Sequence, residues 1–164
     1  MKVVINVCFG GFGLSALATK RIAELNGKEC YFFRNSYKHL GDETPYKHLI
    51  SITMEEASKG LGFFSAYDIP NPNEVMQELE AKEWHSMSDA EKKEHNDLYA
   101  MHSLYYDRQD RTNPQLIQVI EELGDKANGG CAKLRIIEIP DGVEYEIDEY
   151  DGNEHIAETH RTWR

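Results

Sequence analysis

The alternation of apolar and polar positions divides this chain into short elements of two kinds. Residues 3–7 are apolar and mostly β-branched apart from Asn6, a composition typical of a strand that is buried on both faces. Residues 16–25 instead carry leucine, isoleucine and alanine at helical spacing, with Ser15 before them as N-cap and Gly27 beyond them as C-cap. The start of the chain therefore predicts a strand, a glycine-rich turn and a helix.

A second strand is predicted directly after this helix, at residues 30–33, which are aromatic apart from one cysteine. Together with the elements before it, this strand predicts an N-terminal β-α-β unit, which is right-handed if the two strands are parallel neighbours. Further strands are expected at residues 48–54 and 62–67, between polar, glycine-containing loops.

The middle of the chain, from residue 73 to about 102, has helical character. Asn73 is a candidate N-cap for one helix, and Ser88–Glu91 forms a capping box, which marks the start of another. A third helix is predicted over residues 114–124, because proline stands at its first position behind the N-cap Asn113 and a glycine ends it.

The last part of the chain predicts strands. Residues 134–139 are largely apolar, and residues 143–147 alternate apolar with acidic side chains, as in a half-buried strand. Asp151-Gly152 is a strong hairpin signal, after which residues 154–162 return as the last strand. The whole pattern predicts a single α+β domain over residues 1–164, with a mixed, largely antiparallel sheet, an N-terminal β-α-β unit, helices mainly on one face and a C-terminal β-hairpin. Within this domain, we expect residues 70–105 to form a variable helical insert.

Charge restricts the partners of this domain. The formal net charge is −11, and residues 138–158 contain nine carboxylates without one lysine or arginine. Duplex nucleic acid would be repelled, because the sequence also lacks a concentrated basic cluster. No apolar run approaches the roughly 20 residues that a membrane helix needs. We therefore expect neither a nucleic acid nor a membrane as partner.

The cysteines indicate the redox compartment. Cys8, Cys30 and Cys131 are odd in number and widely spaced, which argues against a disulfide framework and against a zinc knuckle. We expect free thiols and a reducing cytoplasm.

The glycine-rich turn is the first candidate for a site. Gly10, Gly11 and Gly13 precede a helix N-terminus, where backbone N–H groups and the helix dipole suit an anion. Both nucleotide-binding fingerprints are absent, and the arginine that a phosphatase loop would place after Cys8 is missing. The alternative is a tight turn whose glycines permit close packing, with neighbouring phenylalanines in the core.

A ligand site here needs side-chain cations and rings as well as backbone donors. Arginines can act as bidentate clamps for phosphate, and aromatic rings as stacking faces. Phe12 and Trp163 are alternatively core residues, and Arg161 alternatively pairs with the acidic hairpin. The candidate ligand-binding residues are Asn6, Phe9, Gly10, Gly11, Phe12, Gly13, Ser15, Arg34, Arg111, Tyr150, His160, Arg161 and Trp163. We expect the Gly10–Ser15 loop to lie on the same side as residues 160–163, with Arg161 or Arg111 within about 15 Å of it.

Metal and catalytic sites have weaker signals. Glu91, His95 and His102 share a helical stripe, but one stripe supplies few ligands and a solvated charged face explains it as well. His155 or His160 beside a carboxylate is the basis for a hydrolase hypothesis, although no nucleophile elbow is present. No catalytic residue, metal ligand or cofactor is assigned.

Both ends of the chain resemble a group of small uncharacterised proteins encoded by tailed bacteriophages and prophages. The resemblance rests on Val-Val-Ile-Asn-x-Cys-Phe-Gly-Gly-Phe-Gly-Leu-Ser at residues 3–15 and on the C-terminal patterns Asp-Arg-Thr-Asn-Pro, Glu-Glu-Leu-Gly, Ile-Glu-Ile-Pro, Glu-Tyr-Asp-Gly and His-Arg-Thr-Trp. It covers roughly the first 35 and the last 55 residues, and residues 35 to 105 depart from it. The resemblance implies expression in the cytoplasm of a bacterial host and implies no reaction.

Three functions follow from these observations. The first is a non-enzymatic, phage-encoded accessory protein that binds a small anionic, nucleotide-like ligand, such as a signal of host defence. The second is an acidic interaction module that inhibits or redirects a host protein. The third is a small hydrolase. We favour the two non-enzymatic functions, and the oligomeric state stays open, with a homo-oligomer among the options.

Overall fold

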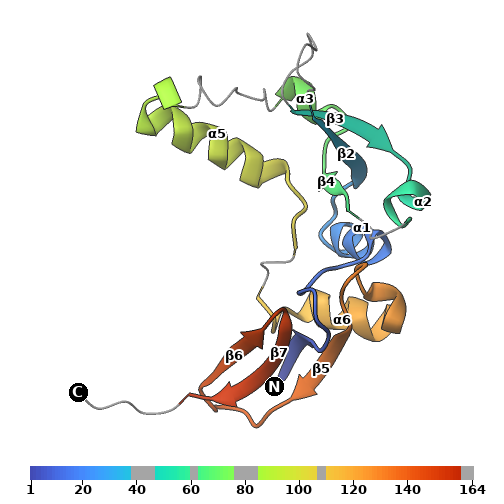
Figure 1. Ribbon diagram of the computed structural model, residues 1–164, viewed down its shortest axis with the longest axis vertical. Helices are drawn as coiled ribbons and strands as arrows, with labels where there is room; N and C mark the ends of the chain where they lie inside the picture. The colour runs from blue at the N-terminus through green and yellow to red at the C-terminus, as the bar shows by residue number, and fades with distance from the viewer. Residues whose placement is uncertain (38–46, 60–62, 76–84, 107–109, 160–164) are drawn as a thin grey trace.

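The computed structural model describes residues 1–37, 47–59, 63–75, 85–106 and 110–159, which form an α+β fold (Figure 1). No helix within these ranges is long and apolar enough to cross a membrane. The elements are β1 (Lys2–Asn6), α1 (Ala16–Leu25), β2 (Tyr31–Tyr37), β3 (Lys47–Ile52), α2 (Met54–Ala57), β4 (Ser65–Tyr67), α3 (Pro72–Val75), α5 (Asp89–His102), α6 (Pro114–Leu123), the 3₁₀ helix η1 (Gly124–Ala127), β5 (Leu134–Glu138), β6 (Tyr145–Tyr150) and β7 (Asn153–Glu158).

The strands form three separate antiparallel sheets. β1 pairs with β5, β2 lies between β3 and β4, and β6 and β7 form the C-terminal hairpin. The predicted α+β class and hairpin are thus confirmed. The expectation of one mixed sheet containing a β-α-β unit is wrong, because β1 and β2 belong to different sheets. β1 does not pair with β2, its nearest neighbour in the sequence, and takes β5 as its partner instead.

Helix α1 lies between two of these sheets, so the helices do not gather on one face as expected. Ala18 and Ile22 pack against β1, β5 and α6, in one buried cluster. Ala16 and Ala23 pack in a second cluster with β2, α2 and β4. The small alanine side chains allow both layers to approach the helix closely, and Figure 1 shows α1 at this central position.

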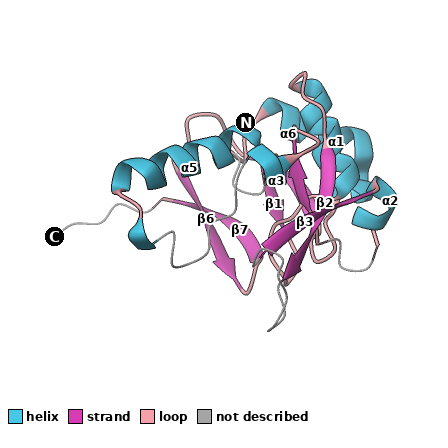
Figure 2. Ribbon diagram, turned by 90° about the horizontal axis from the view of Figure 1, so that it is seen from above, coloured by secondary structure: helices cyan, strands magenta, loops and turns pink. Residues whose placement is uncertain are grey.

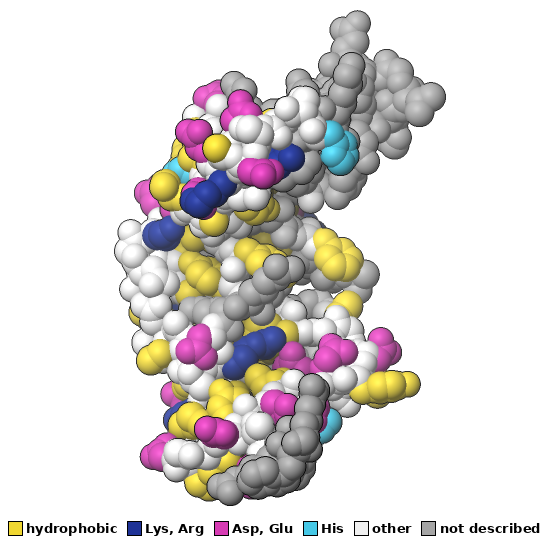
Figure 3. Space-filling model, turned by 90° about the vertical axis from the view of Figure 1, so that its left-hand side faces the viewer, with side chains coloured by type: hydrophobic (Ala, Val, Ile, Leu, Met, Phe, Trp, Pro, Cys, Tyr) yellow, Lys and Arg dark blue, Asp and Glu magenta, His cyan; other side chains and the backbone are white. Residues whose placement is uncertain are grey.

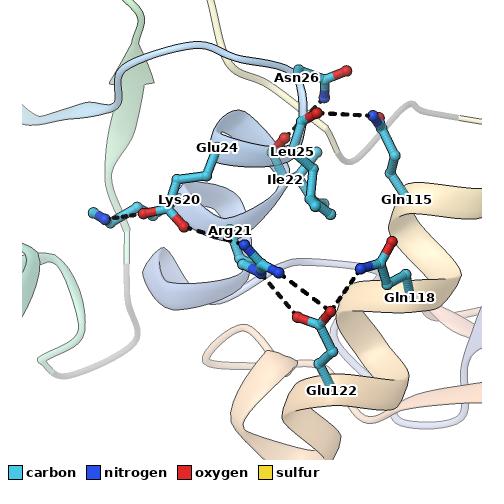
Figure 4. A network of polar contacts seen from close by, with 9 residues as sticks. All are labelled: Lys20, Arg21, Ile22, Glu24, Leu25, Asn26, Gln115, Gln118 and Glu122. Atoms are coloured by element: carbon cyan, nitrogen blue, oxygen red, sulfur yellow. Dashed lines mark hydrogen bonds and ion pairs between the residues drawn. The ribbon is translucent and has the colours of Figure 1, made fainter.

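Polar contacts join α1 to α6 along the edge of their interface (Figure 4). Arg21 Nε donates to Glu122 Oε2 at 2.9 Å, and Gln118 Nε2 donates to Glu122 Oε1 at 2.7 Å. The hydrogen bonds from Arg21 and Gln118 lower the pKa of the Glu122 carboxyl. Gln115 Nε2 donates to the Leu25 carbonyl at 3.4 Å, near the end of α1. The contacts of Glu122 are solvent-exposed, so their net contribution to stability is small.

Helix α5 has a different relation to the rest of the molecule. None of its residues is buried, and it extends to one side of the other elements (Figures 1 and 2). Its N-terminus has the predicted capping box, in which Ser88 and Glu91 satisfy each other's backbone N–H groups. Only toward its C-terminal end does it meet the body, where Leu98 packs beside Phe33, Leu49 and Tyr67.

Strand β1 is buried, as its composition predicts, although it is not the interior strand of a sheet. Val3 and Val4 are fully buried. On the edge that does not pair with β5, Val4 N donates to the Arg111 carbonyl at 2.9 Å. On the same edge Asn6 N donates to Glu154 Oε2 at 2.8 Å. The Arg111 carbonyl and the Glu154 carboxylate thus accept hydrogen bonds from N–H groups on the edge of β1 that a third strand would otherwise cover.

The Asn6 side chain holds three distant segments together. Its Nδ2 donates to the carbonyls of Cys8 and Gly152, each at 2.6 Å, and its Oδ1 accepts from Lys133 N at 2.7 Å. The residue is fully buried. Its amide joins the end of β1, the tip of the β6–β7 hairpin and the segment before β5, and it leaves no polar group of its own unsatisfied.

The cysteines are free thiols, as predicted. Burial raises the pKa of Cys30 to about 11, so this thiol stays protonated at neutral pH.

We predict that Asn6→Ala destabilises the protein strongly. The change orphans two carbonyls and one N–H group that are shielded from water, each at a cost of about 1 kcal/mol or more, so the free energy of unfolding should fall by about 3 kcal/mol or more. Chemical denaturation measures this difference. The matched control is Asn71→Ala, because that amide donates to Glu74 at the surface, and a change below about 0.5 kcal/mol is expected for it. Equal effects of the two substitutions would contradict the role assigned to Asn6.

Candidate functional site

A cavity of about 410 Å³ lies between the glycine loop (residues 10–14) and the segment 103–106 that follows α5. Residues 63–66 and 129–132 complete its walls, with Thr19 of α1 and Tyr99 of α5. Figure 3 shows hydrophobic side chains gathered across the middle of the molecule, where the surface is hollowed. The cavity thus lies between segments that are far apart in the sequence: the glycine loop near the N-terminus, the central segments 63–66 and 103–106, and residues 129–132.

Aromatic rings dominate the side chains of this pocket. The lining contains six rings, together with five glycines and the small hydroxyl residues Thr19, Ser65 and Ser103. Within the described part of the chain, no charged side chain lines it. Burial raises the pKa of Tyr106 to about 12, so its hydroxyl is neutral at physiological pH. The rings are those of Phe12, Phe63, Phe64, Tyr99, Tyr105 and Tyr106.

The glycine loop forms one wall through close backbone packing. Gly10 and Gly11 have φ angles of 118° and 92°, in the region that favours glycine. A Cβ on Gly10 would lie 2.8 Å from the Cys131 Cβ, and one on Gly152 would lie 2.1 Å from the Gly11 nitrogen. The turn therefore follows the close-packing alternative: its glycines let the hairpin tip and the 129–131 loop approach without side chains between them.

This packing also engages polar groups that were candidate anion donors. Gly10 N donates to the Asp151 carbonyl at 3.1 Å. Ser15 Oγ accepts from Ala18 N at 3.1 Å as the N-cap of α1, and it donates to the Lys126 carbonyl at 2.7 Å. The Asn6 amide is engaged in the contacts already described. Both Ser15 and Asn6 position the loop from behind.

Arg111 is the cation that the sequence analysis expected beside the loop. Its guanidinium carbon lies 3.3 Å from the centroid of the Phe12 ring. Its Nη2 also donates to Glu154 Oε1 at 3.1 Å, and Glu154 is only 10% exposed. Arg111 therefore satisfies the distance expected of a clamp, but the Glu154 carboxylate balances its charge.

The remaining candidates lie apart from the pocket or outside the described residues. Phe9 and Tyr150 are 60% and 78% exposed and do not belong to the lining, so Phe9 is not the core residue of the alternative interpretation. Arg34 is an exposed residue of β2, opposite Ile50 of β3. His160, Arg161 and Trp163 fall outside the described residues, and their position beside the loop stays a prediction.

The histidines of the metal and hydrolase hypotheses are placed as follows. His102 lies 2.8 Å from Asp68 Oδ1. His155 lies 3.6 Å from Asp148 Oδ2 on the exposed hairpin. Within the ranges that the structure describes, no three potential ligands converge on one point.

A polar cluster at the end of α5 holds the aromatic wall in place. Asp68 Oδ1 contacts His102 Nδ1 at 2.8 Å, and Asp68 Oδ2 contacts Lys28 Nζ at 2.9 Å. Beside it Leu104 N donates to the Ala66 carbonyl at 2.8 Å. Burial raises the pKa of the Asp68 carboxyl, but hydrogen bonds and charge from Lys28 and His102 outweigh this effect and lower it. The cluster anchors the end of α5 directly before the pocket-lining residues 103–106.

The sequence analysis missed most of the aromatic wall. It treated residues 70–105 as an insert, although Tyr99 and Tyr105 belong to the pocket. The adjacent pairs Phe63-Phe64 and Tyr105-Tyr106 were a detectable signal, because neighbouring aromatic residues at element ends are enriched in binding surfaces.

The fold and the site define an α+β protein with an uncharged, aromatic pocket beside a closely packed glycine turn. Comparison with protein-family models, with curated proteins and with solved structures finds no match to this chain.

We predict that Asp68→Asn loosens α5 from the body. The free energy of unfolding at pH 7 should fall by about 1–2 kcal/mol, because two hydrogen bonds to a charged group are lost. The lowered pKa means that the Asp68 contribution is present at neutral pH and is lost as the pH falls through the folded-state pKa. Stability should therefore decline less in the variant than in the wild type between about pH 5 and pH 3.

Asp97→Asn is the matched control, because Asp97 pairs with Lys93 on exposed α5. Its urea midpoint should stay near the wild-type value. Faster amide exchange in residues 99–106 of Asp68→Asn alone would support the anchoring role, and identical exchange in both variants would refute it.

Proposed function

We propose that this chain is a non-enzymatic binding protein that takes the planar group of a small molecule into its aromatic pocket. One observation carries the proposal: a cavity of about 410 Å³ is lined by six aromatic residues and by the backbone of the glycine turn. Cavities of roughly 300–1,000 Å³ with mostly apolar walls are the usual size of small-molecule sites. A planar ring could lie against the glycine backbone and stack on the aromatic side chains.

The polar groups of the pocket suit hydrogen bonding more than charge pairing. Thr19, Ser65 and Ser103 offer hydroxyl groups, whereas Arg111 faces Glu154 across an ion pair. A nucleobase or a similar heteroaromatic ring fits this lining better than a phosphate does. The group proposed to bind is therefore a planar heteroaromatic ring, for which ring stacking, and not anion recognition, supplies the binding energy.

The proposed setting is the cytoplasm of a bacterial host, in which the chain would act as a phage accessory protein. The resemblance of the two chain ends to phage and prophage proteins is what supports this setting. Sequestration of a host signal that carries a planar base is the role most consistent with a pocket and no assigned catalytic residue.

A second candidate function is protein interaction through the C-terminal hairpin. Glu146, Asp148 and Tyr150 share one face of β6, and Tyr150 is 78% exposed. Tyrosine is enriched in protein contacts and among the residues that dominate their binding energy. The tyrosine thus distinguishes this surface from an ordinary solvated acidic face.

We predict that two ring deletions weaken the binding of 4-methylquinoline, a planar probe that is neutral at pH 8. Phe63→Leu and Tyr105→Leu should each raise its dissociation constant about two- to tenfold, because each removes one stacking face. Isothermal titration calorimetry measures the constants. Tyr150→Leu removes an exposed ring outside the pocket and should leave binding unchanged. The proposed function fails if 4-methylquinoline and its charged analogues all fail to bind the wild-type protein.

A further inference from the structure

We propose that the physiological ligand of the aromatic pocket is a planar organic cation, such as an N-alkylated or protonated heteroaromatic ring. This inference rests on the proposed function and assigns the charge of the ligand, which the proposed function leaves open. The ligand inferred here is positively charged, whereas the glycine turn in the sequence suggested an anion.

The walls supply the first argument. Aromatic faces carry negative electrostatic potential, and a cation within about 6 Å of a ring centroid is attracted to it. Six aromatic residues line one cavity here, and no charged residue of the described ranges is part of its lining. One of the rings, that of Phe12, already contacts a cation, the Arg111 guanidinium, so the other five rings are the ones proposed to attract the ligand. Such a lining resembles the aromatic cages that recognise organic cations, and it offers an anion no counter-charge.

The charges just behind the walls supply the second argument. Arg111 stacks on Phe12, but Glu154 neutralises it at 3.1 Å. On the other side Lys28 is paired with Asp68 at 2.9 Å. The charges of Arg111 and Lys28 are therefore compensated by neighbouring carboxylates, so these two cations contribute little positive potential to the pocket.

The wider charge distribution supplies the third argument. The hairpin tip contacts the glycine wall, because Asp151 accepts a hydrogen bond from Gly10 N. Asp148, Glu149 and Asp151 are exposed near this tip, and the chain has a net charge of −11. The protein field beside the glycine wall thus attracts cations and repels anions.

The shape of the glycine wall selects a planar group. A Cβ placed on Gly11 or Gly13 would meet nothing within 4 Å, so open space lies where side chains would project. Both residues line the cavity. A flat ring can approach this backbone closely, and Tyr105 and Phe63 of the same lining supply aromatic rings for the positive charge.

A charge series on one ring system tests the inference by calorimetry at pH 8. The probes are 1-methylquinolinium, the neutral 4-methylquinoline and the anion quinoline-4-carboxylate. We expect 1-methylquinolinium to bind about tenfold more tightly than 4-methylquinoline, which corresponds to about 1.4 kcal/mol, and the carboxylate to bind weakest. The preference should weaken only partly between about 50 and 500 mM salt, because contact with the rings is short-ranged, whereas attraction to the acidic surface is screened.

Variants separate the pocket from general surface attraction. Phe63→Leu and Tyr105→Leu should reduce the preference for the cation, and the conservative Tyr105→Phe should retain it. Tyr150→Leu is the control outside the pocket.

Equal binding of the cation and the neutral ring would overturn the inference and leave the proposed function standing. A cation preference that survives both ring deletions, or that vanishes with salt, would assign it to the acidic surface and also overturn the inference. Binding by none of the three probes would overturn both proposals.

Discussion

The burial of one polar residue at the end of β1 is the constraint on which the site depends. Asn6 is fully buried, and its amide satisfies backbone groups of the β1 end, the hairpin tip and the segment before β5. These three segments are distant in sequence, and they surround the glycine turn. Because a buried amide is tolerated only when its hydrogen bonds are complete, the contacts of Asn6 determine where the turn and the hairpin tip meet.

Helix α1 extends this constraint to the other half of the molecule. Its N-terminus is capped by Ser15 at the end of the glycine turn, and its two faces pack against different sheets. The turn is thereby fixed to a helix that also contacts β2 and β4. The pocket lies where these layers leave room between the turn and the end of α5. Its volume is thus a consequence of packing around α1.

The electrostatics of the site follow from pairing between distant residues. Arg111 would be a strong anion ligand if it were alone, but it lies between the Phe12 ring and the Glu154 carboxylate. The same carboxylate accepts the N–H of Asn6. One buried acid therefore stabilises the strand edge and neutralises the nearest cation. Glu154 thus serves both the packing of β1 and the charge balance of the site, and this balance favours ring stacking over anion recognition.

The sequence by itself determined the local elements. Apolar runs, capping boxes and glycine signals predicted β1, α1, α6 and the C-terminal hairpin, because these depend on neighbours a few residues away. The pairing of β1 with β5 depended on contacts across more than 120 residues, and the ion pair that neutralises Arg111 joins residues 43 positions apart. Only the tertiary structure decided this strand pairing and this ion pair, because both depend on which polar groups come into contact when distant segments pack together. The pocket was also decided by the tertiary structure, because its walls come from four segments that no local pattern connects.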